Sequence, residues 1–163
     1  MIDASKCFLS LSGTWSNIPA WEAFVLEAGS YGAGTWVHHL ARHDGSEGTS
    51  KVLELGVQPH GQMPNALEDA LHALGLGYLW SWESAHLYDG GFELWRPGDE
   101  GSRTATIGQE GDFLLRLEEA QNPDLVAQAA GLNADRLAFI AHKKLLFVGS
   151  AHDQLRAGTM RFW

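Results

Sequence analysis

The stretch YLWSWESAHLYDGG, residues 78–91, decides how the chain can be arranged, because aromatic side chains alternate with smaller ones along it. Successive side chains of a β-strand point to opposite faces of a sheet, so the alternation predicts a strand over residues 77–88. One face would carry Tyr78, Trp80, Trp82, Ser84, His86 and Tyr88, and the other Leu79, Ser81, Glu83, Ala85 and Leu87. The turn residues DGG at 89–91 then join this strand to FELW (92–95) as a β-hairpin.

The aromatic face of this strand has two interpretations, and the sequence leaves both open. Aromatic rows in strands usually belong to the core, where helices or another layer cover them. An exposed aromatic row would instead mark a ligand or partner site. Both faces could also be covered, one by helices and one by the second half of the chain or a second subunit. The candidate ligand-binding residues are Tyr78, Trp80, Trp82, Glu83 and His86, with Glu83 as a candidate acid–base group.

Four segments have the three-and-four spacing of apolar residues that predicts amphipathic helices: 18–28, 64–74, 122–131 and a segment from 133 to about 141. Asn17 and Asn122 stand where N-caps are expected, and Pro64 opens the second segment. Gly75 ends the second helix, and Gly131 is expected to end the third.

Strand-like segments lie between the helices, at 7–13, 34–42, 50–58, 77–88, 92–95, 103–107, 112–119, 144–152 and 159–163. Their order over the first half is that of a ferredoxin-like βαββαβ sandwich. We therefore expect an α+β fold with an antiparallel sheet and helices packed on one face, ferredoxin-like over residues 7–96. Residues 103–163 would add a βαββ-type C-terminal extension, within a single domain over 1–163. Ser-Ala-His occurs at both 84–86 and 150–152, which suggests a faint internal repeat.

The charge and composition limit the partners of this chain. Its 11 basic and 20 acidic residues give a net charge of −9, and only Lys143 and Lys144 are adjacent cations. Phosphate contacts need clustered basic residues, so nucleic-acid binding is not expected, whereas a basic protein partner is. Solubility alone would also explain the charge. No apolar run approaches the roughly 20 residues that cross a bilayer, no secretory signal is evident, and Cys7 is the single cysteine. These features predict a cytoplasmic protein that does not bind membranes.

The densest histidine cluster is VHHLARHD, residues 37–44. On a helix, His39 and His43 would share a face at a spacing suited to zinc. On a strand they would lie roughly 13 Å apart, too far to hold one ion. Residues 35–37 favour a strand, so we expect no metal and no other cofactor, with His39 and His43 as metal candidates only if the segment is helical.

Ser84, His86 and Asp89 are the residue types of a hydrolytic triad, but their spacing argues against that use. Side chains two positions apart on a strand run parallel instead of converging, and a triad normally assembles from distant segments. The G-x-S-x-G motif of a nucleophile elbow is missing from the sequence.

Two classes of function follow from these residues. The first is a non-catalytic, acidic protein that binds another protein, as an inhibitor, immunity-type or accessory factor does. The alternative is a small-molecule binder or enzyme whose pocket lies at the aromatic sheet face, around Trp80, Trp82 and His86. A homodimer is also expected, because antiparallel sheets of this kind often pair.

Overall fold

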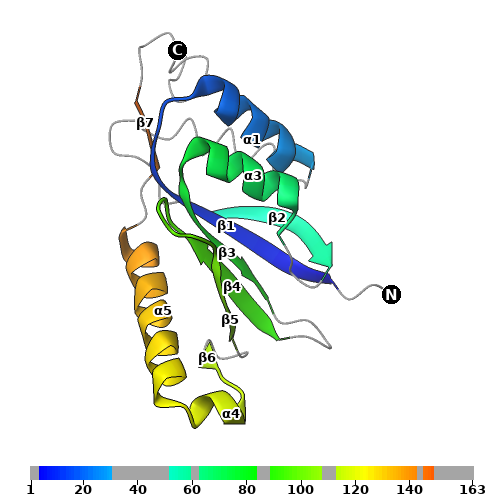
Figure 1. The fold of residues 1–163 in the computed structure, drawn as a ribbon. Helices are drawn as coiled ribbons and strands as arrows, with labels where there is room; N and C mark the ends of the chain where they lie inside the picture. The colour runs from blue at the N-terminus through cyan, green and yellow to red at the C-terminus, as the bar shows by residue number, and fades with distance from the viewer. Residues whose placement is uncertain are drawn as a thin grey trace.

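The computed structural model of the protein describes residues 4–30, 52–59, 63–83, 89–107, 113–142 and 145–148. In this part of the chain, one sheet runs in the order β2-β1-β3-β4-β5-β6, with every neighbouring pair antiparallel (Figure 1). The strands are β1 (Ala4–Trp15), β2 (Val52–Pro59), β3 (Gly77–Trp82), β4 (Gly90–Trp95), β5 (Arg103–Ile107) and β6 (Phe113–Leu114). A further strand, β7 (Leu145–Phe147), pairs in parallel with the end of β1. The predicted α+β class with an antiparallel sheet is confirmed.

Two helices, α1 (Ile18–Ser30) and α3 (Asn65–Leu74), pack beside each other on one face of the sheet (Figure 1). Tyr78 and Trp80 of β3 are fully buried in the core between this face and the helices. The helices contribute the buried side chains Ile18, Trp21, Phe24, Ala28, Leu67, Leu71 and Leu74 to the same core. The aromatic face of β3 therefore packs in the core against α1 and α3, which is the first of the two interpretations that the sequence left open.

The predicted helix starts at Asn17 and Asn122 are confirmed by their caps. Oδ1 of Asn17 accepts a hydrogen bond from the backbone N of Ala20 at 3.1 Å, and Oδ1 of Asn122 accepts one from Asp124 at 3.0 Å. The second helix begins after Pro64 and ends at Gly75, whose φ of 68° is the left-handed conformation typical of a helix C-cap.

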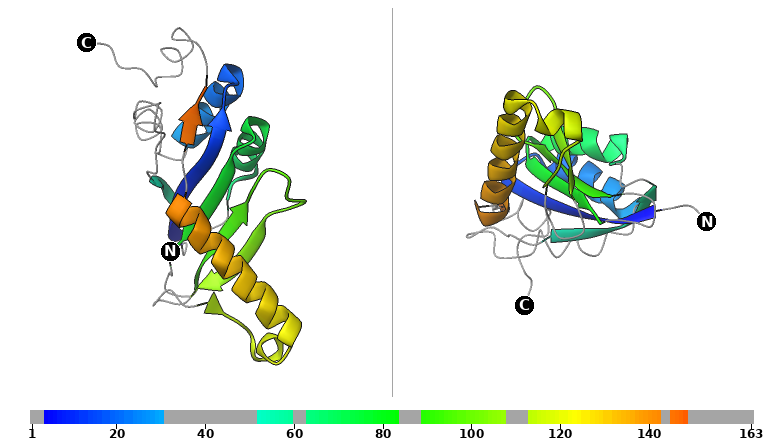
Figure 2. Two further views of the ribbon diagram at one scale, coloured as in Figure 1. Left: turned by 90° about the vertical axis from the view of Figure 1, so that its left-hand side faces the viewer. Right: turned by 90° about the horizontal axis from the view of Figure 1, so that it is seen from below.

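A third helix, α5 (Pro123–His142), covers the opposite face of the sheet (Figure 2). Phe139 of α5 packs in a second core cluster with Leu79 of β3 and with Phe92 and Leu94 of β4. Because Leu79 alternates with Tyr78 and Trp80, each face of β3 belongs to a different core. The expectation that helices pack on one face is correct for α1 and α3 but wrong for α5.

The helix α5 is continuous through Gly131, where the sequence predicted one helix to end and another to begin. A glycine inside a helix costs only about 1 kcal/mol relative to alanine, so it weakens a helix without ending it. Leu132 and Phe139 lie seven residues apart, two helical turns, and both pack against the sheet. This tertiary contact holds the two predicted segments as one helix.

The predicted strand over 112–119 is wrong beyond its first residues. It pairs with β5 only through Phe113 and Leu114, and α4 (Leu117–Ala120) follows. The backbone N of Arg116 donates to Oε2 of Glu119 at 2.9 Å, which stabilises the start of this short helix. The local capping interaction therefore favours a helix at residues for which the alternation of apolar side chains predicted a strand.

The predicted turn DGG is also wrong in part, because Gly90 and Gly91 lie within β4 and pair with β5. A Cβ on Gly91 would collide with Cζ2 of Trp82 and lie 2.7 Å from the carbonyl oxygen of Ala105. The indole of Trp82 thus lies across Gly91, its pairing partner on the neighbouring strand.

Several predicted features lie outside the described residues: the strand over 34–42, residues 84–88 of the strand over 77–88, residues 149–152 of the strand over 144–152, and the strand over 159–163. The second Ser-Ala-His, at 150–152, lies outside them as well. The part of the chain that is described contains no helix with the length and apolar character to cross a membrane.

Replacing Gly91 with alanine should lower the free energy of unfolding by about 1–3 kcal/mol, because neither the Trp82 ring nor the Ala105 backbone leaves room for a methyl group. Urea unfolding followed by tryptophan fluorescence measures the change. Gly101→Ala is the matched control, since no atom lies within 4 Å of a Cβ there. Equal stability of the two variants would contradict the close approach of Trp82.

Replacing Gly131 with alanine should raise the free energy of unfolding by about 0.5–1 kcal/mol. A Cβ at this position meets no atom within 4 Å, so the change only removes the conformational cost of glycine in the middle of α5. A lower melting temperature for this variant would indicate that α5 is broken at this residue.

Candidate functional site

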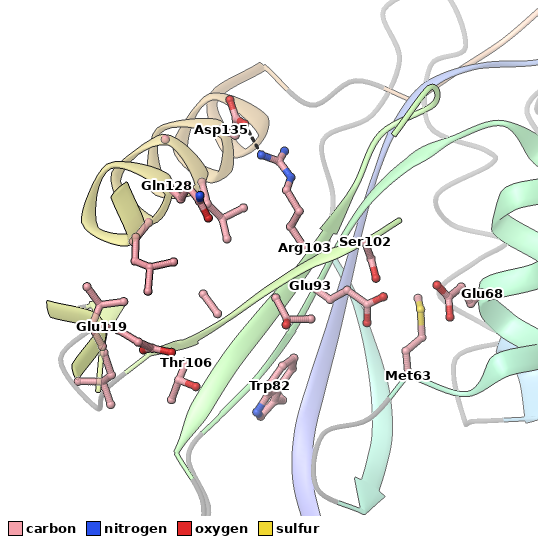
Figure 3. A pocket seen from close by; sticks show the side chains of 18 of the residues that line it. Met63, Glu68, Trp82, Glu93, Ser102, Arg103, Thr106, Glu119, Gln128 and Asp135 are labelled. Carbon is pink, nitrogen blue, oxygen red and sulfur yellow. Dashed lines mark hydrogen bonds and ion pairs between the residues drawn. The ribbon is translucent and has the colours of Figure 1, made fainter. Parts of the chain in front are cut away.

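A hollow of about 1190 Å³ lies along β5, with residues of α3 on one side and residues of α4 and α5 on the other (Figure 3). Its lining comprises Met63, Asn65, Glu68, Trp82, Glu93, Ser102, Arg103, Thr104, Ala105, Thr106, Leu114, Leu115, Glu119, Leu125, Gln128, Ala129, Gly131, Leu132 and Asp135. Glu68 and Met63 lie on one side, the α4 and α5 residues lie on the other, and β5 passes between them (Figure 3). We refer to this space as the hollow.

The hydroxyl of Tyr78 lies between two carboxylates that line the hollow. It is 3.1 Å from Oε1 of Glu68 on α3 and 3.1 Å from Oε1 of Glu93 on β4. A phenol has a single proton, so it can donate to only one of these oxygens at a time. Burial, followed by the negative charges of Glu93 and Glu68, raises the pKa of Tyr78 well above its usual value, so the phenol stays neutral.

The rings of His72 and Trp95 lie beside this group of Tyr78, Glu68 and Glu93. Nε2 of His72, one turn after Glu68 on α3, lies 3.9 Å from Oε1 of Glu68. The centre of its imidazole lies 4.3 Å from that of Trp95, and Trp95 stacks with Tyr78 at 5.9 Å. These contacts fix the side of α3 that carries Glu68 relative to β3 and β4.

On the α5 side, ion pairs of Asp135 tie the helix to the sheet. Nη1 of Arg103 on β5 donates to Oδ2 of Asp135 at 2.8 Å (Figure 3). Nη2 of Arg96 lies 3.4 Å from the same oxygen. The hydrogen bond from Arg103 lowers the pKa of Asp135, with a smaller contribution from the charge of Arg96. Asp135 therefore neutralises the cation that reaches into the hollow.

Three carboxylates of the hollow have no such counter-ion in the described part of the chain. Within the described ranges, Glu68, Glu93 and Glu119 form no ion pair with lysine or arginine. Their hydrogen-bond donors are neutral groups: the Tyr78 hydroxyl for the first two and the backbone N of Arg116 for the third. The hollow consequently has a net negative charge and suits a cation.

Of the five candidate ligand-binding residues from the sequence, Trp82 lines the hollow. Tyr78 and Trp80 are fully buried in the core, and only the hydroxyl of Tyr78 reaches the carboxylates. Glu83 is exposed at the end of β3, and His86 lies outside the described residues. A ligand-binding role for this face stays a prediction, and among its described residues Trp82 is the one that lines the hollow.

The metal candidates His39 and His43 lie outside the described residues. Among the residues that are described, no group of three or more His, Cys, Asp or Glu side chains could hold a metal ion.

Sequence reasoning missed most of the hollow. The sequence shows Glu68 only as a polar residue of the helix predicted over 64–74, and it shows Glu93 only as part of the strand FELW, although Glu93 lies between Phe92 and Leu94. The sequence marks Glu83 as a candidate because it is a carboxylate beside Trp82 in a predicted strand, and the same signal applies to Glu93, which has apolar residues on both sides. No local signal marks the lining residues of α5, because they meet β5 only in the folded chain.

Comparison of the chain with protein-family models, with curated proteins and with solved structures finds no match in any of the three.

Replacing Tyr78 with phenylalanine should lower the free energy of unfolding by about 1–3 kcal/mol at neutral pH, because two carboxylates lose their shared donor. This difference from the wild type should shrink above pH 10. Above this pH, Tyr78 loses its proton in the unfolded wild type but keeps it in the folded one. The free energy of unfolding of the wild type therefore falls by at most about 1.4 kcal/mol per pH unit. Urea unfolding of both proteins between pH 7 and 11 measures the effect. Parallel pH profiles would contradict the buried neutral phenol.

Proposed function

We propose that this protein is a non-catalytic binding protein that engages a basic segment of another protein at the hollow, as an inhibitor, immunity-type or accessory factor does. The observation that carries the proposal is that exposed apolar side chains line the same space as carboxylates that have no lysine or arginine partner among the described residues. Neither feature is explained by the packing of the described chain itself.

The apolar part of this surface comes from the elements around β6 and α5. Leu114, Leu115 and Leu125 all line the hollow, with exposed fractions of 41%, 38% and 37%. Burying them against a partner would stabilise a complex by the hydrophobic effect, at about 25 cal/mol for each Å² of apolar surface. Apolar patches rimmed by polar groups are typical of protein-binding sites.

The acidic part of the surface indicates the sign of the charge that the partner carries. Glu68, Glu93 and Glu119 add local negative charge to a chain whose net charge is −9. Such a field speeds the encounter with a basic partner and opposes an acidic one. A partner segment with lysine or arginine beside apolar residues therefore fits this surface best.

A small-molecule ligand is the second candidate function. The indole of Trp82 and the carboxylate of Glu93 line the same space, and together they could hold an organic cation by cation–π and ionic contacts. The volume of about 1190 Å³ exceeds the roughly 300–1,000 Å³ typical of small-ligand pockets. The larger volume favours a protein segment over a small molecule as the occupant of the hollow.

The finer fold assignment is also a proposal. With β1 between β2 and β3, and with α1 and α3 on one face, residues 7–96 would be ferredoxin-like if residues 34–42 form a strand beside β2. The βαββ extension, the cytoplasmic location and the homodimer stay predictions. A dimer would have to form away from the face of β3 and β4 that α5 covers.

Replacing Leu125 with lysine should reduce the amount of the natural partner that co-purifies with this protein by at least about tenfold. The change removes an apolar contact and places a positive charge where a basic segment is expected. Leu125 lies in the first turn of α5 and is exposed, so the fold should be preserved. Quantitative mass spectrometry of material captured from the source cells measures the loss.

Leu26→Lys is the matched control, since Leu26 is 73% exposed on α1 and does not line the hollow. It should capture the same partner as the wild type. If the Leu125→Lys variant recovers that partner at the wild-type level, the hollow is not the binding surface.

A further inference from the structure

Within the part of the chain that the structure describes, β6 pairs with only a short part of the outer edge of β5. The two strands pair only at Thr106 with Leu114 and Ile107 with Phe113. The chain then leaves the sheet at Leu115 and begins α4 two residues later. Among the described residues, no strand pairs with the outer edge of β5 from Arg103 to Ala105.

The hollow lies along this edge. All five consecutive residues from Ser102 to Thr106 line it. Side chains of a strand alternate between the two faces of the sheet, so a space over one face would touch every second residue. Contact with each residue in turn means that the hollow reaches the edge of β5, where backbone N–H and C=O groups point outward.

The two sides of this edge differ in chemistry. On the face toward α3 lie the carboxylates of Glu68 and Glu93, and on the face toward α5 lie the apolar side chains of Leu125 and Leu132.

We propose that an extended segment of the partner adds a strand to the outer edge of β5, with lysine or arginine facing Glu68 and Glu93 and with apolar residues facing α5. This inference rests on the proposed function and specifies its binding mode. Strand addition supplies affinity through backbone hydrogen bonds, while alternate side chains supply specificity. The partner motif is therefore basic and apolar in alternation, with a period of two.

A second copy of this chain fits the edge poorly. Pairing two β5 edges would bring Glu68, Glu93 and Glu119 of both copies toward one another, on chains that each carry a net charge of −9. Like charges placed together oppose association. A basic segment of a different protein meets the same carboxylates favourably.

A fluorescein-labelled hexapeptide of alternating lysine and valine tests the proposal by fluorescence anisotropy. Two isomers of equal charge are compared with it, one N-methylated at every lysine and the other at every valine. In an added strand only alternate N–H groups point toward β5, so one isomer should lose at least about tenfold in affinity and the other should bind as the parent peptide does. Equal binding of both isomers would show non-specific attraction and would overturn the inference.

The protein side of the test uses Glu68→Gln/Glu93→Gln, which keeps acceptors for the Tyr78 hydroxyl while removing two charges. Its affinity for the parent peptide should fall by about tenfold. Glu22→Gln/Glu27→Gln on α1 removes the same charge away from the hollow and should bind as the wild type does. Equal loss in both variants would overturn the inference. The comparison of N-methylated isomers stays decisive if a variant is unstable, because it leaves the protein unchanged.

The outcomes separate this inference from the proposed function. If capture of the natural partner depends on Leu125 while the parent peptide fails to bind, the hollow binds its partner without strand addition, and only this inference falls. If light scattering shows a dimer that Glu68→Gln/Glu93→Gln strengthens, the edge is occupied by a second copy, and the inference also falls.

Discussion

The burial of β3 between two hydrophobic layers is the constraint on which the rest of this structure depends. Tyr78 and Trp80 face α1 and α3, and Leu79 faces α5. An aromatic side chain buries about 150–250 Å², which at about 25 cal/mol per Å² corresponds to several kcal/mol for each ring. Whole domains are stable by only about 5–15 kcal/mol, so this strand cannot change its register or turn over without loss of the fold.

The same strand connects the core to the candidate site. The ring of Tyr78 is part of the core, while its hydroxyl contacts Glu68 and Glu93 at the wall of the hollow. The acidic wall is therefore positioned by a rigid buried ring. On the opposite wall, the ion pair of Arg103 with Asp135 fixes α5 against β5. The hollow is held open between two anchored elements, which is the condition for a preformed binding surface.

The fold of the β6–α4 segment decides what the hollow can do. If residues 112–119 had continued as a strand, they would have paired with the whole edge of β5 and filled this space. The backbone of Arg116 instead donates to Glu119, and the chain turns into α4. Within the described ranges, one local capping interaction thus leaves the edge of β5 unpaired from Arg103 to Ala105, beside carboxylates and exposed leucines.

By itself, the sequence determined the features that depend on neighbouring residues. Asn17 and Asn122 cap helices through their own side chains, Gly75 ends α3, and the alternation at 78–82 specifies a strand with two distinct faces. Only the tertiary structure decided which face meets which helix, that α5 runs unbroken through Gly131, and that Glu68, Glu93 and the edge of β5 share one hollow. These outcomes depend on contacts between segments far apart in the chain, whose packing energies exceed the local preferences that a sequence pattern records.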